Sequence, residues 1–142
     1  MSAESNPVTD ALEAYSATVL AKDLDAFLDL YADDVVVFDG WQKWEYRGRT
    51  EWRPVIEAWF VGLREKTCEV RFSEITATVG DYTAFAHATV RYAGVDPDGS
   101  EAESMMQRLT IGLTKFDDDW KITHEHTSLP LDMESGKAIF ER

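Results

Sequence analysis

Residues 108–128 read RLTIGLTKFDDDWKITHEHTS, two alternating segments on either side of three consecutive aspartates. Side chains of a strand point alternately to its two faces, so each segment is typical of a strand with one apolar and one polar face. The aspartate run is typical of a turn. The stretch therefore predicts an antiparallel hairpin in which Phe116 pairs with Trp120.

This pairing determines which side chains share a face of the sheet. The polar face is expected to collect two arginines and all three histidines of the chain together with smaller residues, namely Arg91, Arg108, His87, His124, His126, Thr110 and Gly112. Strict alternation also places Ile122 on this face. The opposite face of the first strand carries the apolar stripe Leu109, Ile111 and Leu113.

Unpaired charged side chains are costly to bury, so the histidine face either meets water or lines a polar pocket. Aromatic residues upstream favour a pocket covered by helices. The rest of this pocket is expected to be lined by Trp41, Tyr46, Trp59 and Phe60. A slip of the hairpin by one residue would reverse this assignment.

The remaining sequence predicts a single α+β domain over residues 1–142, with peripheral tails at 1–6 and 133–142. Apolar residues recur at helical spacing in three segments, which begin near Pro7, after Asp23 and at Thr50. A short strand over 35–38 interrupts them. From residue 68 the period becomes two, which predicts antiparallel strands over 68–79, 82–95, 103–116 and 120–128.

Composition excludes several classes of partner. The 142 residues carry a net charge of −13, which disfavours nucleic acid and anionic membrane surfaces. The single cysteine, Cys68, has no partner for a disulfide or a CxxC motif. No signal-peptide pattern is visible, so the expected location is the cytoplasm.

Two groups of residues resemble a known family. Tyr31-Ala32-Asp33-Asp34, a strand ending at Asp39, and Tyr46-Arg47-Gly48 look like the first half of the NTF2-like superfamily. The closing hairpin resembles its SnoaL-like members and the association domain of calcium/calmodulin-dependent kinases. The resemblance implies a cone, in which a curved mixed sheet surrounds a pocket closed by three N-terminal helices. It also implies a homodimer through the convex sheet face.

The ketosteroid isomerases of this superfamily imply roles for particular residues. Their general base matches Asp39, and the tyrosine that stabilises their oxyanion matches Tyr15 by gap-free spacing. Their second oxyanion donor, an acid on the penultimate strand, falls at Gly112 and is therefore absent. Loss of one such donor can lower a rate by about 10²–10³, so the same isomerisation is not expected.

Each candidate also has a plainer interpretation. Asp39 is either a general base or a turn residue facing water, and Tyr15 is either a donor or core packing. His124 and His126 are either an acid–base pair or structural, and with Asp39 and His87 they are one arrangement for a metal site. No metal and no cofactor are expected. The arginines are either an anion clamp, with Arg108 the better candidate, or salt-bridge residues.

The sequence thus predicts a pocket for a small organic molecule, apolar with one anionic or carbonyl group. If the protein is an enzyme, cofactor-independent proton transfer next to a carbonyl is expected, as in an isomerase, cyclase or dehydratase. The alternative is a non-enzymatic binding or association domain. The apolar stripe Leu109, Ile111 and Leu113 would then serve as its oligomer interface.

Overall fold

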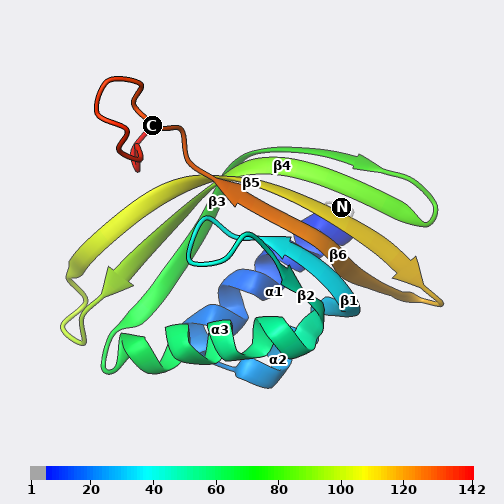
Figure 1. The fold of residues 1–142 in the computed structure, drawn as a ribbon. Helices are drawn as coiled ribbons and strands as arrows, with labels where there is room; N and C mark the ends of the chain where they lie inside the picture. Colours follow the sequence, from blue (N-terminus) through cyan, green and yellow to red (C-terminus); the bar gives the residue numbers. More distant parts are fainter. Residues whose placement is uncertain (1–5) are drawn as a thin grey trace, which may run out of the picture.

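The computed structural model describes residues 6–142, and it contains three helices and a curved sheet (Figure 1). The helices are α1 (Pro7–Ala21), α2 (Leu24–Leu28) and α3 (Gly48–Leu63). The strands are β1 (Tyr31–Phe38), β2 (Tyr46–Arg47), β3 (Thr67–Val79), β4 (Thr83–Val95), β5 (Glu101–Phe116) and β6 (Asp119–Ser128). No helix in this part of the chain is both long and apolar enough to cross a membrane. Of the expected N-terminal tail, residues 1–5 lie outside the described residues.

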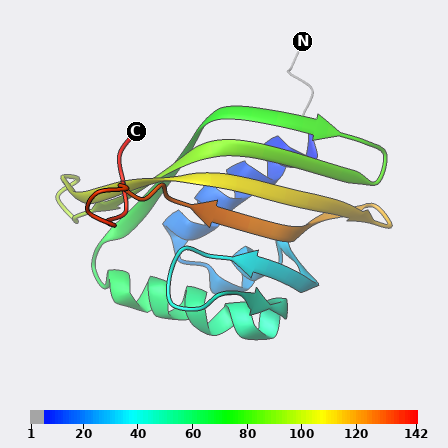
Figure 2. The same cartoon turned by 45° about the horizontal axis from the view of Figure 1, so that its top comes forward.

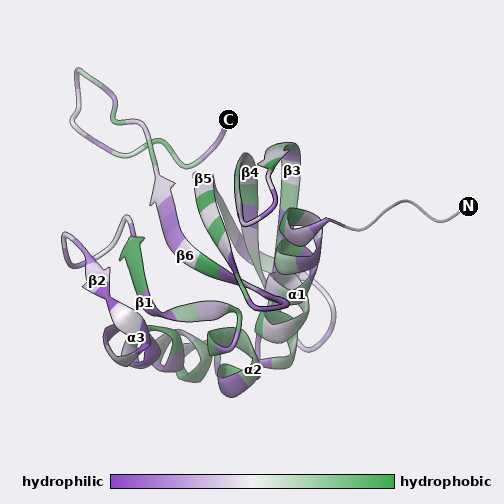
Figure 3. Ribbon diagram, turned by 90° about the vertical axis from the view of Figure 1, so that its right-hand side faces the viewer, coloured by the Kyte–Doolittle hydropathy of each residue, from purple (hydrophilic) through white to green (hydrophobic). Residues whose placement is uncertain are grey.

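The six strands form one sheet in the order β2-β1-β6-β5-β4-β3. The pair β1–β6 is parallel and the other neighbours are antiparallel, so the sheet is mixed. All three helices lie on the concave side of the sheet, whereas its convex side carries none within residues 6–142 (Figures 2 and 3). The expected α+β cone is confirmed.

Local capping explains where the helices begin. Asn6 and Asp23 cap α1 and α2, since their side chains accept hydrogen bonds from backbone N–H groups three residues later, at 2.9 and 3.1 Å. The third helix begins at Gly48, two residues before the predicted Thr50. Gly48 has a φ of 77°, and the Glu51 carboxylate accepts the N–H of the preceding residue, Arg47, at 2.8 Å.

The closing hairpin contains a β-bulge that the sequence analysis did not anticipate. Phe116 pairs with Asp119, and Leu113 pairs with Ile122, but the next residue, Gly112, pairs with His124. Thr123 is therefore an extra residue in β6, and the side chains beyond it change face. The prediction that Ile122 shares a face with the histidines is wrong, because Ile122 is buried in the core.

The helices cover the apolar stripe rather than the histidines. Leu109, Ile111 and Leu113 are 5%, 2% and 2% exposed within the core of the single chain. The predicted polar face does collect the arginines and histidines, but it is the convex face, so the expectation that it lines the pocket is wrong. Burying three aliphatic side chains is favourable, whereas burying these charges would be costly. The stripe is therefore not an oligomer interface, and the homodimer stays a prediction without that support.

Residues 129–142, here called the C-terminal arm, pass beyond the end of β6 (Figure 1). The arm folds back on itself through a bridge between Leu131 and Ala138. Its Phe140 carbonyl then accepts the Met106 N–H of β5 at 2.7 Å, beyond the last β5–β6 pair at Arg108 and Ser128. The predicted tail at 133–142 is thus attached to the sheet.

Two adjacent residues of β5 test this assignment of faces. Replacing buried Ile111 by alanine is expected to lower the free energy of unfolding by about 2–5 kcal/mol, through lost burial and the cavity left behind. Replacing exposed Thr110 by alanine is expected to cost less than about 1 kcal/mol. Urea unfolding measures both. Equal losses, or a larger loss at Thr110, would contradict the assigned faces.

Candidate functional site

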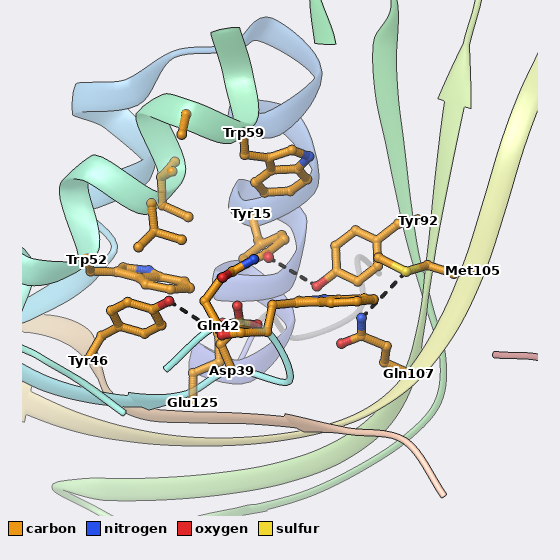
Figure 4. Close-up of a pocket in the computed structure, with 14 residues that line it drawn as sticks. Tyr15, Asp39, Gln42, Tyr46, Trp52, Trp59, Tyr92, Met105, Gln107 and Glu125 are labelled. Atoms are coloured by element: carbon orange, nitrogen blue, oxygen red, sulfur yellow. Dashed lines mark hydrogen bonds between the residues drawn. The ribbon is translucent and has the colours of Figure 1, made fainter. Parts of the chain in front are cut away.

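A cavity of about 480 Å³ lies between the helices and the concave face of the sheet (Figure 4). Six aromatic residues contribute to its wall: Tyr15, Trp41, Tyr46, Trp52, Trp59 and Tyr92. Its polar side chains are Asp39, Gln42, Gln107 and Glu125. A mainly apolar cavity with a few polar groups is the usual form of a small-molecule site.

Glu125 is a buried carboxyl group in this wall. The bulge at Thr123 directs it to the concave face, where it is 3% exposed. The Tyr31 hydroxyl donates a hydrogen bond to its Oε1 at 2.6 Å. Burial raises the pKa of Glu125 to about 7, although the hydrogen bond from Tyr31 opposes the shift and the nearby Asp39 adds to it.

Asp39 follows β1 directly and faces the same cavity. The Thr127 hydroxyl donates to its Oδ1 at 3.2 Å. Burial raises the pKa of Asp39, while hydrogen bonds from Thr127 and the Gly40 N–H act in the opposite direction. Thr127 and Glu125 lie on the same strand face, about 7 Å apart along β6. The two carboxyl groups are therefore neighbours in one cavity.

The different environments of these carboxyl groups suit them to different roles. The larger shift at Glu125 leaves Asp39 the more acidic of the two. Near neutral pH, the cavity accordingly holds one group suited to accept a proton and one suited to donate it.

Hydrogen-bond donors complete the wall. The hydroxyls of Tyr15 and Tyr92 lie 3.2 Å apart, and burial raises the pKa of both, so both stay protonated (Figure 4). Trp52 is 3% exposed, and its indole N–H is buried next to the Tyr31 hydroxyl rather than open to the cavity. The pair of tyrosine hydroxyls is thus the donor that the wall offers to an oxygen-bearing ligand.

The structure brings some of the predicted site residues together and separates others. Tyr15, Asp39, Trp41, Tyr46 and Trp59 line the cavity. Phe60 lies in the core, 5.9 Å from Phe27 between ring centroids. On the convex side of the sheet lie His87, Arg91, Arg108, Thr110, His124 and His126.

The convex-face residues have partners of their own. Arg91 forms two hydrogen bonds with Glu101, at 2.8 and 2.9 Å, and is therefore part of a salt bridge on this face. Arg108 Nε donates to the Ser128 hydroxyl at 3.0 Å. His124 Nδ1 lies 2.7 Å from the Val36 carbonyl oxygen. These residues cannot hold a ligand inside the cavity.

The metal arrangement is not formed either. Asp39 faces the cavity, whereas His126 faces away from it on the other side of β6. Within residues 6–142, no group of three histidine, cysteine or acidic side chains is placed to hold a metal ion.

Sequence reasoning missed Glu125, Trp52, Tyr92 and Gln107. Alternation in β4 would have found Tyr92, which is adjacent to Arg91 and so faces the other way. Glu125 alternates with the two histidines, so strict alternation predicts it on the apolar face, outside the expected pocket. The match of the second oxyanion donor to Gly112 does not identify a site residue either, because Gly112 lies beside His124 on the convex face.

Comparison with known proteins agrees with this fold. The profile described as SnoaL-like domain matches residues 8–132. An NTF2-like protein of unknown function from Pseudomonas putida KT2440 is 27% identical, with a TM-score of 0.82 over 94% of this chain and 91% of that one. A candidate calcium/calmodulin-dependent protein kinase II association domain from Xanthomonas campestris is 20% identical, with a TM-score of 0.74 over 89% and 88%.

An NTF2-like protein with a cystatin-like fold from Novosphingobium aromaticivorans is 16% identical, with a TM-score of 0.74 over 91% of this chain and 82% of that one. No curated protein matches this chain. The second and third structural similarities concern the fold alone.

The buried Glu125 predicts a pH-dependent stability. Its folded-state pKa of about 7 lies above the value of about 4.3 expected in the unfolded chain. The folded state therefore binds the proton more tightly, and stability falls as pH rises from 5 to 8, by about 3 kcal/mol from this group. Glu125→Gln should remove most of this fall in urea unfolding.

Glu13→Gln, at an exposed glutamate on α1, is the control and should keep the pH dependence of the wild type. An unchanged slope in Glu125→Gln would mean that Glu125 titrates normally.

Proposed function

The chain belongs to the family of SnoaL-like domains, and from this premise we propose that it catalyses cofactor-independent proton transfer next to the carbonyl group of a small, flat, uncharged molecule. The observation that carries the proposal is the pair of carboxyl groups, Asp39 and Glu125, in one aromatic cavity. Proton transfer between positioned groups of different acidity needs no metal or redox cofactor.

The charges of the cavity wall define the ligand. The residues that line it include no lysine or arginine. A bound carboxylate would lie near Asp39 and Glu125 without a compensating cation, which is unfavourable in a site of low polarity. Of the two polar groups that the sequence favoured, a carbonyl therefore fits better than an anion.

In this mechanism, the Asp39 carboxylate takes a proton from the carbon next to the carbonyl. The electron pair of that C–H bond forms the enol double bond while the carbonyl oxygen accepts a hydrogen bond or the proton from Glu125. Donors at Tyr15 and Tyr92 support the developing negative charge. Where the substrate has a C=C bond next to the abstracted C–H, the enol is a dienol. Return of the proton from Asp39 to the far carbon of that bond, and of the enol proton to Glu125, then re-forms the carbonyl, moves the double bond and completes an isomerisation.

Isomerases, cyclases and dehydratases share the first of these steps, so the proposal concerns proton abstraction rather than one product. The association-domain alternative depended on the apolar stripe of β5. Because that stripe is buried in the chain's own core, it no longer favours that alternative.

Hydrogen–deuterium exchange tests the abstraction without knowledge of the natural substrate. We expect the protein to accelerate exchange of the activated C–H protons of 2-tetralone, a flat uncharged ketone, in D₂O followed by NMR. Asp39→Asn should lower the acceleration by at least about 100-fold, since a positioned base contributes about 10²–10⁴. Glu125→Gln retains an N–H donor and should have a smaller effect.

Asp118→Asn, at an exposed aspartate of the β5–β6 turn, is the matched control and should exchange as the wild type does. If 2-tetralone binds but Asp39→Asn is as active as the wild type, Asp39 is not the base. Binding without any acceleration would make the domain a binding module rather than an enzyme.

A further inference from the structure

Trp41 connects the cavity to the C-terminal arm. Its indole stacks on the Phe140 ring, with ring centroids 5.9 Å apart and planes 11° from parallel. The same residue lines the cavity. One side of the indole is therefore in contact with the arm, and the rest of its surface is available to a ligand.

Phe140 itself is anchored to the cavity wall. Its carbonyl oxygen accepts the Met106 N–H at 2.7 Å. The neighbours of Met106 on β5, Met105 and Gln107, both line the cavity. The preceding residue, Ile139, donates its N–H to the Pro130 carbonyl at 2.9 Å, which closes the arm on itself. The arm thus holds Phe140 at a fixed place beside the site.

The neighbouring residues in sequence hardly restrain the side chain of Trp41. Residues 39–45 form no regular helix or strand, and Trp41 is 41% exposed. Its carbonyl accepts hydrogen bonds from the Lys43 N–H at 2.9 Å and from the Tyr46 hydroxyl at 3.4 Å. These bonds fix the backbone but leave the side-chain torsions free. The aromatic contact with Phe140 restricts those torsions.

We propose that the C-terminal arm is part of the ligand site: Phe140 positions Trp41, and the pair favours flat ligands of two or more fused rings over single rings. This inference rests on the proposed function only in that the cavity binds flat uncharged molecules. A larger ring system covers more of a fixed indole and completes a stack of Phe140, Trp41 and ligand. A single ring covers less of the indole, so its binding affinity falls less when Trp41 becomes mobile.

The test compares the binding of 2-naphthol and phenol by isothermal titration calorimetry. Phe140→Ala should weaken 2-naphthol binding about five- to tenfold and phenol binding about twofold or less, as expected for loss of one aromatic contact. Phe140→Tyr keeps the ring and should bind both probes as the wild type does. Met133→Ala, which truncates an exposed side chain elsewhere in the arm, is the control and should also leave both affinities unchanged.

A double-mutant cycle separates positioning from general damage to the arm. If Phe140 acts through Trp41, Phe140→Ala should have no further effect on 2-naphthol binding in a Trp41→Ala protein. A further loss in that background, or equal losses for the two probes in Phe140→Ala, would overturn the proposal.

The outcomes also distinguish this proposal from the proposed function. Wild-type protein that binds neither probe overturns both. Wild-type protein that binds both probes while Phe140→Ala keeps its full affinity for 2-naphthol overturns only the role of the arm. The exchange experiment with Asp39→Asn is independent of that second result, because it tests the base and leaves the arm unchanged.

Discussion

The bulge at Thr123 is the constraint on which the arrangement of the site depends. Before it, β6 directs Ile122 into the core beneath the helices; after it, the same strand directs Glu125 inward and both histidines outward. Without the extra residue, either Ile122 would face water or Glu125 would leave the cavity. One irregularity thus allows a single strand to supply both the apolar core and the polar end of the site.

The two ends of the concave face of the sheet differ in how closely the helices pack against them, and this difference creates the site. At one end, Leu109, Ile111 and Leu113 pack against the helices and exclude water. At the other, the helices leave a space walled by aromatic rings, into which Asp39 and Glu125 project. The same apolar surroundings that stabilise the fold therefore raise the pKa values of both carboxyl groups. Stability and chemistry at this site have a common physical origin.

Much of the fold and part of the site could be predicted from the sequence. Periodicity indicated the helices and long strands, and the resemblance placed Asp39 and Tyr15, which do line the cavity. The face of the sheet that the helices cover was not predictable in the same way. Either face of β5 satisfied strict alternation, and a bulge at a threonine has no distinctive residue pattern. The hydrogen bond between Phe140 of the arm and Met106 of β5 was not predicted, because it joins residues far apart in sequence and the arm has no apolar periodicity.

Glu125 is difficult to explain by stability alone. A leucine at this position would extend the apolar core, whereas a glutamate needs a proton or a costly buried charge, and a single hydrogen bond from Tyr31 compensates only part of that cost. Tyr31 is itself fully buried, so the polar pair occupies space that apolar side chains would fill more favourably. The pair nevertheless stands beside Asp39, at the polar end of the cavity. A structural role for Glu125 leaves its energetic cost unexplained. A role in proton transfer instead requires a carboxyl group that is buried enough to keep its proton near neutral pH and that lies close to a second carboxyl group, here Asp39.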